Sequence, residues 1–183
     1  NVASAYAGHF NGQGHTIKNL NFTAKQNFNG LFGVITTGAV IENFNIYGTY
    51  RTTYQYLGGV AGYARDDELG IRNVHSYVNI FNTCAGGRQG GIMGGAHGTK
   101  TFLENCIYSG TMDSNDNGGA GNYGGIIGYV QNATSVYVDI TNCLFNGRLF
   151  NSAATPCGCT FGGIVGYANA RFVTIKNCLS IGT

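Results

Sequence analysis

The stretches GGIIGYVQNATSVYVDITNC (residues 124–143) and GGIVGYANARFVTIKNC (residues 162–178) begin and end alike but differ in what lies between. A catalytic motif seldom recurs at intervals along a chain, whereas a structural unit that stacks on copies of itself must recur. The two stretches therefore predict a repeat protein, and they supply the pattern with which the rest of the chain is compared.

The same pattern recurs along the whole chain as a glycine-rich head and an asparagine-containing tail. The heads are GLFG at Gly30, GGVAGY at Gly58, GGIMGG at Gly90, GGIIGY at Gly124 and GGIVGY at Gly162. The tails place one asparagine in each repeat: Asn19, Asn43, Asn73, Asn105, Asn142 and Asn177. The spacing of these asparagines ranges from 24 to 37 residues, which indicates a constant core with loops of variable length.

The short segments of the repeat predict β-strands. GGIIGYV and ITNCLFNG are β-rich, are bounded by glycine and lack the 3.6-residue period of a helix. Short strands with glycine corners, repeated at roughly 20–50 residues, are typical of a parallel β-solenoid. We predict an all-β, right-handed parallel β-solenoid of roughly six coils, forming a single domain over residues 1–183. The approximate repeat units are 8–26, 27–57, 58–89, 90–123, 124–161 and 162–183.

The columns of equivalent residues predict how the coils are held together. Each residue of a solenoid lies over its equivalent in the next coil, about 4.8 Å away, so the asparagine amides can bond to one another and to corner backbone groups. The position after the asparagine is apolar in the first three repeats and cysteine in the last three. We expect these thiols to be buried, stacked and reduced: Cys106, Cys143 and Cys178. The next position should face outward and becomes apolar in the last coils, which predicts a stripe that is covered by a loop, by a neighbouring domain or by another chain at an interface: Ile107, Leu144 and Leu179.

Heads and tails together resemble the GLUG-motif repeat family. GLFG at Gly30 and the four GGxxG heads match the family's Gly-Leu-hydrophobic-Gly pattern, and FNGQGHTIKNLNF, from Phe10, resembles the segment that commonly precedes such repeats. The resemblance covers about Gly8 to Thr183 and implies an extracellular or cell-surface, adhesin-like protein without catalysis in the repeats. The NC tails, the long cysteine-bearing loops and the missing strands before the FNG segment depart from the family pattern.

Composition excludes several classes of function. Charged residues make up only 10% of the chain, against roughly 25% in an average soluble domain. The net charge of +2 and the lack of a basic run argue against nucleic-acid binding. No stretch approaches the ~20 apolar residues of a membrane span. A surface of low charge that is rich in Asn, Thr and Tyr is typical of extracellular fibrous proteins. The chain begins at Asn1 without an initiator Met or signal sequence, which we interpret as a processed product or a piece of a longer protein.

No arrangement of side chains predicts catalysis or a bound cofactor. Glu42 and Glu104 occupy equivalent positions two coils apart, but Arg72 lies between them, so we expect a mixed-charge ladder and not an enzyme. The four histidines lack metal-ligand spacing.

One loop partly matches a calcium-binding sequence. DSNDNG places oxygen ligands at alternating positions: Asp113, Asn115 and Asn117. The twelfth position of that loop is Gly124, where a bidentate Glu belongs. An ordinary turn is therefore favoured over a calcium site.

The remaining cysteines lie in two loops that precede repeat heads. Both loops should project from the same corner, two coils apart, so we expect a disulfide from Cys84 to Cys157 or Cys159, with one thiol left over. A metal or redox site at the CGC sequence is the alternative.

Two further features concern ligands and modification. TYRTTYQY places Tyr50, Tyr54 and Tyr56 in one loop between coils, where they either contact a sugar or protein ligand or pack against neighbouring coils. Asn21 and Asn132 begin glycosylation sequons, and Asn132, in a loop, is the better acceptor.

Two functions follow from this pattern. In the first, a stiff rod held by internal ladders of asparagine, cysteine and aliphatic residues presents loops for adhesion to a glycan or a cell-surface protein. In the second, the chain is the subunit of an extracellular filament that polymerises head to tail through uncapped solenoid ends, or joins flanking domains there.

Overall fold

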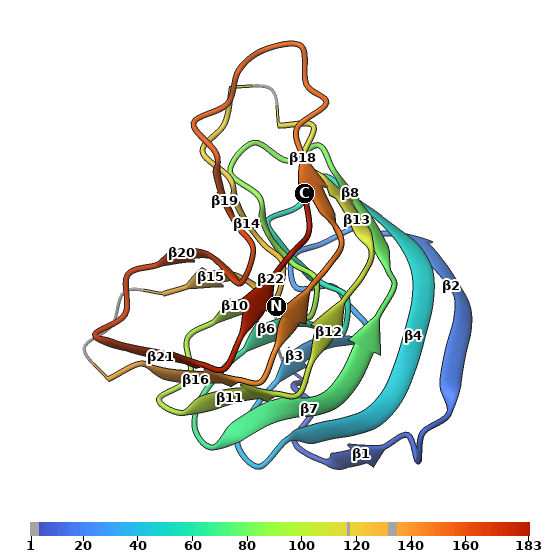
Figure 1. Ribbon diagram of the computed structural model, residues 1–183, viewed down its shortest axis with the longest axis vertical. Coiled ribbons are helices and arrows are strands. Elements are labelled where there is room, and N and C mark those ends of the chain that lie inside the picture. The colour runs from blue at the N-terminus through green and yellow to red at the C-terminus, as the bar shows by residue number, and fades with distance from the viewer. Residues whose placement is uncertain (1–3, 117, 132–134) are drawn as a thin grey trace.

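The computed structural model describes residues 4–116, 118–131 and 135–183, and these residues form twenty-two β-strands and no helix (Figure 1). Every strand pair is parallel. The fold is a β-solenoid of about five turns, which confirms the predicted all-β parallel solenoid. Six coils was slightly too many, because the first repeat unit contributes only β1 and β2, both to one sheet.

Three sheets run along the solenoid axis. The five-stranded sheet contains β3 (Phe32–Ile35), β6 (Ala61–Ala64), β10 (Met93–Ala96), β15 (Ile127–Val130) and β20 (Val165–Ala168). The four-stranded sheet contains β5 (Tyr56–Gly58), β9 (Arg88–Gly90), β14 (Asn122–Gly124) and β19 (Thr160–Gly162). The large sheet contains the other thirteen strands: β1 (His9–Asn11), β2 (Thr16–Thr23), β4 (Val40–Thr52), β7 (Leu69–Ser76), β8 (Asn79–Asn82), β11 (Thr101–Glu104), β12 (Ile107–Tyr108), β13 (Thr111–Asp113), β16 (Tyr137–Thr141), β17 (Leu144–Phe145), β18 (Arg148–Phe150), β21 (Phe172–Lys176) and β22 (Leu179–Ser180).

The cross-section of the solenoid is not a simple ring. In Figure 1 the large sheet curves around one side of the molecule, and the four-stranded and five-stranded sheets meet at an angle on the other side. Strands β14 and β19 run toward the centre of the molecule, and β15 and β20 then run outward to the left. The two sheets therefore enclose a re-entrant corner on the outer surface.

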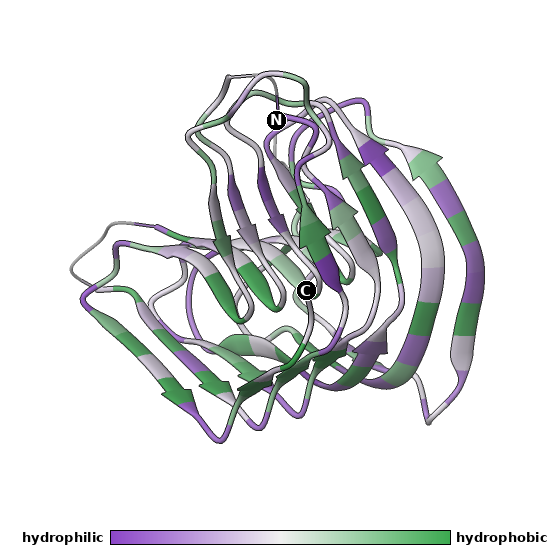
Figure 2. Ribbon diagram, turned by 45° about the horizontal axis from the view of Figure 1, so that its top comes forward, coloured by the Kyte–Doolittle hydropathy of each residue, from purple (hydrophilic) through white to green (hydrophobic). Residues whose placement is uncertain are grey.

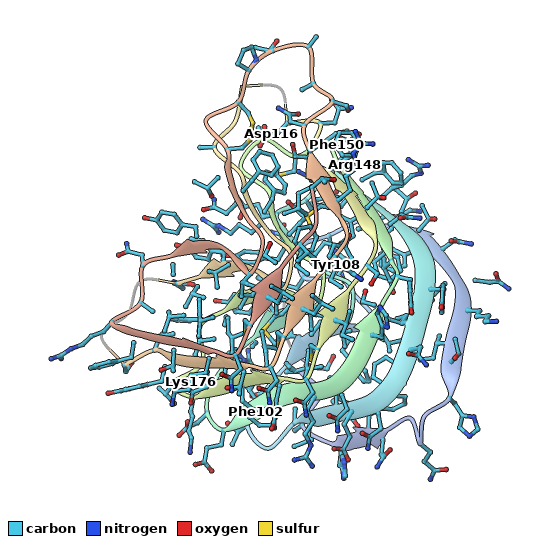
Figure 3. All side chains as sticks on the ribbon, in the orientation of Figure 1. Phe102, Tyr108, Asp116, Arg148, Phe150 and Lys176 are labelled. Carbon is cyan, nitrogen blue, oxygen red and sulfur yellow. A yellow bond between two sulfur atoms is a disulfide. The ribbon has the colours of Figure 1, made fainter. Side chains whose placement is uncertain are left out.

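The core consists of columns of apolar residues in register. Ile41, Ile71, Leu103 and Ile140 pair in successive coils and are fully buried. Figure 2 shows hydrophobic and hydrophilic residues alternating along the strands, as expected when one face of each strand is inside. Tyr108 points into the interior (Figure 3), and its hydroxyl donates to the carbonyl of Val78 at 3.1 Å.

The glycine heads form the corner between the four-stranded and five-stranded sheets. A Cβ atom on Gly124 would lie 1.9 Å from the carbonyl oxygen of Ile127, so no side chain fits there. The first glycines of the other GGxxG heads meet the equivalent carbonyl at 1.9–2.0 Å: Gly58, Gly90 and Gly162. The carbonyl of Ile126 accepts N–H bonds from both Ile92 and Met93 of the preceding coil, at 3.1 and 3.0 Å. The head is thus a tight, backbone-bonded turn.

The asparagine ladder follows a second corner. Asn73 donates from Nδ2 to Oδ1 of Asn43 at 2.9 Å, Asn105 donates to Asn73 at 2.9 Å, and Asn142 donates to Asn105 at 3.1 Å. These residues have left-handed backbone, with φ between 52° and 62°, which asparagine tolerates better than most residues. The sequence pattern predicted an internal asparagine ladder, and this prediction was wrong. The ladder lies on the outer surface, since most of its members are exposed.

Asn19 was wrongly assigned to this ladder. The residue that reaches Asn43 in the first coil is Asn11, whose Oδ1 accepts from Asn43 Nδ2 at 3.2 Å. Asn19 instead lies at an irregularity of β2, where the register with β4 shifts between Ile17 and Leu20. It shares the left-handed backbone of the ladder residues, with φ of 62°, which explains why its local sequence resembles theirs. Asn177, in the last coil, has φ of 52°.

No helix of a length and apolarity suited to crossing a membrane is found in the described part of the chain.

Candidate binding groove

The re-entrant corner collects outward-facing side chains from two sheets. Strands of the four-stranded sheet contribute Tyr56, Arg88, Asn122 and Thr160, which stack in register because their strands pair in parallel. Strands of the five-stranded sheet contribute Tyr63, Tyr129 and Tyr167. We call the surface formed by these seven residues the corner groove.

Local sequence explains why these side chains face outward. In the four-stranded sheet they alternate with a column that points into the core, in which Leu57, Gln89 and Tyr123 are fully buried. In the five-stranded sheet each groove tyrosine ends a glycine head, in GGVAGY, GGIIGY and GGIVGY. The tight head turn therefore directs the two sets of side chains toward each other.

Aromatic packing fills the groove in its first coils. The Phe28 ring stacks on that of Tyr56 at 5.1 Å, and the Tyr56 and Tyr63 rings meet edge to face at 4.9 Å. Burial raises the pKa of Tyr56, and the Arg88 guanidinium opposes that shift. The Tyr63 hydroxyl donates to Oε1 of Gln131 at 2.9 Å, which ties this wall to the loop beyond β15.

Arg88 lies between the two walls. Its Cζ is 4.9 Å from the centre of the Tyr56 ring and 4.3 Å from that of Tyr129. Its Nη1 donates to the Tyr56 hydroxyl, while its Nε is buried and has no hydrogen-bond partner among the described residues. These contacts hold the plane of the guanidinium in the corner.

The later coils leave the groove open. The Tyr129 and Tyr167 rings are 5.7 Å apart and nearly parallel, with 5° between their planes, and Tyr167 is 39% exposed. The hollow beside them has a volume of about 310 Å³. It is lined by Ala120, Gly121, Asn122, Tyr129, Gly158, Thr160 and Tyr167. Aromatic rings next to an amide and a hydroxyl match the mixed apolar and polar surface of a sugar ring.

The tyrosines expected to contact a ligand are only partly available. Tyr50 is fully buried, stacks on Phe22 at 4.2 Å and donates to the carbonyl of Gly59. Tyr56 is 7% exposed and forms the floor of the corner groove, and Tyr54 remains 37% exposed. The expectation of a single tyrosine loop was therefore wrong, because strand β4 runs through to Thr52 and its alternation turns Tyr50 inward.

The thiol column has the expected place. Cys106 and Cys143 are buried, Cys178 is half-buried at the end of the stack, and all three are free. Burial raises the pKa of Cys106. The Cys178 Sγ accepts from the Cys143 backbone N–H at 3.4 Å.

The disulfide differs from both expected pairings. Cys157 bonds to Cys159 within the same loop, and Cys84 is free. The loop of the intervening coil separates Cys84 from that pair, because Asp116 contacts Cys159 at 3.6 Å and Gly86, next to the Cys84 loop, at 3.2 Å. Figure 3 shows Asp116 within this group of loops.

In the described part of the DSNDNG loop, the Asp113 carboxylate is engaged by hydrogen bonds from the chain itself. The Asp113 carboxylate accepts from the backbone of Asn115 and from the backbone and hydroxyl of Ser152, at 2.7–3.1 Å. No group of His, Cys, Asp and Glu able to hold a metal ion occurs among the described residues. Asn117 lies outside the described residues.

The sequons and the interface stripe are placed as follows. Asn132 lies outside the described residues, and Asn21 is exposed on β2, where its Oδ1 accepts from the Thr49 backbone at 2.8 Å. Ile107, Leu144 and Leu179 pair in register, and the outward stripe they form ends with Leu179 at 55% exposure.

The acidic column forms the expected charge ladder at Glu42 and Arg72, whereas Glu104, in register with Arg72, takes part in no ion pair among the described residues. Glu42 accepts from His9, Asn11 and Arg72, at 2.6, 3.1 and 2.5 Å. The Arg72 hydrogen bond, followed by that of His9, holds the pKa of Glu42 below its ordinary value. Its oxygens are thus committed to neighbours and not presented to a substrate.

Sequence reasoning missed Arg88, Asn122, Tyr129, Thr160 and Tyr167. One signal was present, since the last position of three heads is tyrosine. These residues come together because of the angle at which the two sheets meet. That angle is seen only in the folded backbone and cannot be read from the sequence.

Comparison with protein-family models, with curated proteins and with solved structures gives no match to this chain.

Proposed function

We propose that this chain is a non-catalytic, extracellular β-solenoid of the GLUG-motif type, which binds a glycan in the corner groove and serves in surface adhesion. The observation that carries the proposal is the parallel, partly exposed pair Tyr129 and Tyr167 beside a hollow of about 310 Å³. Because the two rings stack on each other, they present their edges and the exposed part of Tyr167 to the C–H groups of a sugar in the hollow, and Asn122 and Thr160 offer polar groups to its hydroxyls.

The proposal also draws on the rigidity of the scaffold. Both walls of the groove belong to strands that pair with the preceding coil, so the ligand contacts are formed before binding. Tyrosine recurs on one wall at Tyr63, Tyr129 and Tyr167, with Gly95 at the equivalent position between the first two, and successive coils lie about 4.8 Å apart. A site built this way suits an extended chain of sugars better than a compact small molecule.

An extracellular location is supported by the Cys157–Cys159 disulfide, because disulfides persist mainly in oxidising compartments. The non-catalytic assignment is supported by the groove chemistry, since the residues that line the open hollow are uncharged in the described chain. Glycosidases act through a pair of carboxyl groups that flank the bond they cleave.

The test is binding of soluble oligosaccharides to the purified chain by isothermal titration calorimetry. Removing the Tyr167 ring should weaken binding, and removing an equally exposed tyrosine outside the groove should not. Release of reducing sugar ends during incubation would contradict the non-catalytic assignment.

A second candidate function is association of solenoid ends between copies of the chain. It is favoured by the apolar residues on the last rung, where Leu179 is 55% and Ile181 is 63% exposed. A second copy would add its strands to the unpaired edges of β21 and β22. Light scattering and negative-stain microscopy test it, because association should be concentration-dependent and should be lost in the Leu179→Lys, Ile181→Lys variant.

A further inference from the structure

The charge balance of the corner groove narrows the class of glycan. Arg88 is the charged member of the seven groove residues, and it takes part in none of the four ion pairs formed by the described residues. The carboxylate of Asp116 is buried and already accepts from Gly86, Gly119 and Tyr123. The positive charge of Arg88 is therefore not matched by an acidic side chain in the described chain.

The guanidinium is also held in a fixed orientation. One nitrogen donates to the Tyr56 hydroxyl, and the planes of Tyr56 and Tyr129 limit its rotation. Because Nε is buried and one Nη1 donor is used by Tyr56, the remaining donors on the two Nη atoms are the ones that can bind carboxylate oxygens. Holding the guanidinium in place before binding reduces the entropy that the complex would lose.

Tyr129 connects this charge to the open hollow. Its ring has the Arg88 guanidinium over one face and the Tyr167 ring stacked on the other face, and the hollow lies beside the two rings. Register places Asn122 directly after Arg88 along the groove. A sugar ring that occupies the hollow next to Asn122 and Tyr129 therefore lies within about one coil spacing of the guanidinium.

We infer that the glycan is an acidic one, a polymer containing uronic acid whose carboxylate pairs with Arg88 while a sugar ring occupies the hollow beside Tyr129 and Tyr167. This inference rests on the proposed glycan-binding function and names its ligand class. No bond forms or breaks in the interaction.

The experiment compares each acidic glycan with its own neutral form. Oligomers of galacturonan, alginate and hyaluronan are titrated into the purified chain beside the same oligomers after reduction of their carboxyl groups to primary alcohols. At least one acidic form should bind tenfold or more tightly than its reduced form, a difference of ~1.4 kcal/mol, and the preference should shrink as salt is added.

Variants of Arg88 assign that preference to one residue. Arg88→Gln should abolish the difference in affinity between the acidic and reduced forms, and Arg88→Lys should keep part of that difference. The matched control is Arg51→Gln, because Arg51 also stacks on an aromatic ring, with its Cζ 4.5 Å from the centre of the Phe81 ring, but lies on the large sheet away from the groove.

The outcomes separate the inference from the proposed function. Equal binding of acidic and reduced forms overturns the inference and leaves glycan binding standing. Failure of all the acidic and neutral oligomers to bind overturns both. An equal loss in the Arg51→Gln control shows a general effect of net charge and also overturns the role of Arg88. If Arg88→Gln does not fold, the comparison of acidic and reduced forms with the unaltered chain still decides the matter.

Discussion

The Nδ2 of Asn105 donates to the Oδ1 of Asn73 at 2.9 Å, one coil away, although both side chains are exposed to solvent. Asn105 also has a left-handed backbone conformation, with φ of 52°. The asparagine column thus has two roles, a conformational one at the corner and a bonding one between coils.

Two substitutions of Asn105 separate these roles. Asn105→Gly keeps the left-handed conformation and loses the amide bonds, so it should lower the free energy of unfolding by about 1 kcal/mol. Asn105→Ala loses the bonds and also strains the backbone, so it should cost about 1–2 kcal/mol more. Urea denaturation measures both values, and equal losses would contradict the conformational role.

Substitution of a head glycine should destabilise the protein more than substitution of Asn105. Gly124→Ala should destabilise the protein by more than about 3 kcal/mol or prevent folding, because its Cβ would lie 1.9 Å from the Ile127 carbonyl oxygen. The control is Gly158→Ala, where the nearest atom would be 3.6 Å away, and its effect on the melting temperature should be small. Similar losses in both variants would mean that the head turn is not sterically restricted.

The carboxylate of Glu42 predicts a dependence of stability on pH. Its pKa is lowered in the folded chain by Arg72 and His9, so the stabilisation is fully present above the ordinary value of 4.5 and is lost as the pH falls through the lower folded value. Glu42→Gln should be less stable than the unaltered chain at pH 7, and the difference should vanish in acid.

Glu68→Gln is the matched control for this measurement, because Glu68 forms an exposed ion pair with Lys100 at 3.2 Å. Its thermal stability should differ little from that of the unaltered chain between pH 3 and pH 7. A Glu42→Gln curve parallel to that of the unaltered chain would contradict the proposed coupling.

The cysteines should label in three classes. With the protein folded and oxidised, a maleimide should react with Cys84 and Cys178, which are half-buried, and spare the buried Cys106 and Cys143. Unfolding should expose the second pair, and only a reductant should expose Cys157 and Cys159. Peptide mass spectrometry assigns the sites, and a blocked Cys84 in the unfolded, unreduced chain would restore the pairing expected from the sequence.

Much of the coil could be predicted from the sequence because the repeat itself encodes it. The head glycines, the asparagine corner from Asn43 to Asn142 and the cysteine column each depend on contacts between equivalent residues, so their recurrence reveals them. Asn19 was misassigned because a register shift in β2 leaves no mark on the local pattern. Arg88 and Tyr129 were missed as partners because they come from different sheets, and only the angle between those sheets brings them together.

The central claim is tested most directly by titrating the oligosaccharides into the unaltered chain, the Tyr167→Ala variant and the Tyr47→Ala variant. Tyr47 is 38% exposed against 39% for Tyr167, and it stacks on Tyr77 at 4.2 Å on the large sheet. The account predicts that Tyr167→Ala weakens binding about five- to tenfold, whereas Tyr47→Ala binds as the unaltered chain does. Unchanged affinity in Tyr167→Ala, or an equal loss in both variants, would contradict the assignment of the corner groove as the glycan site.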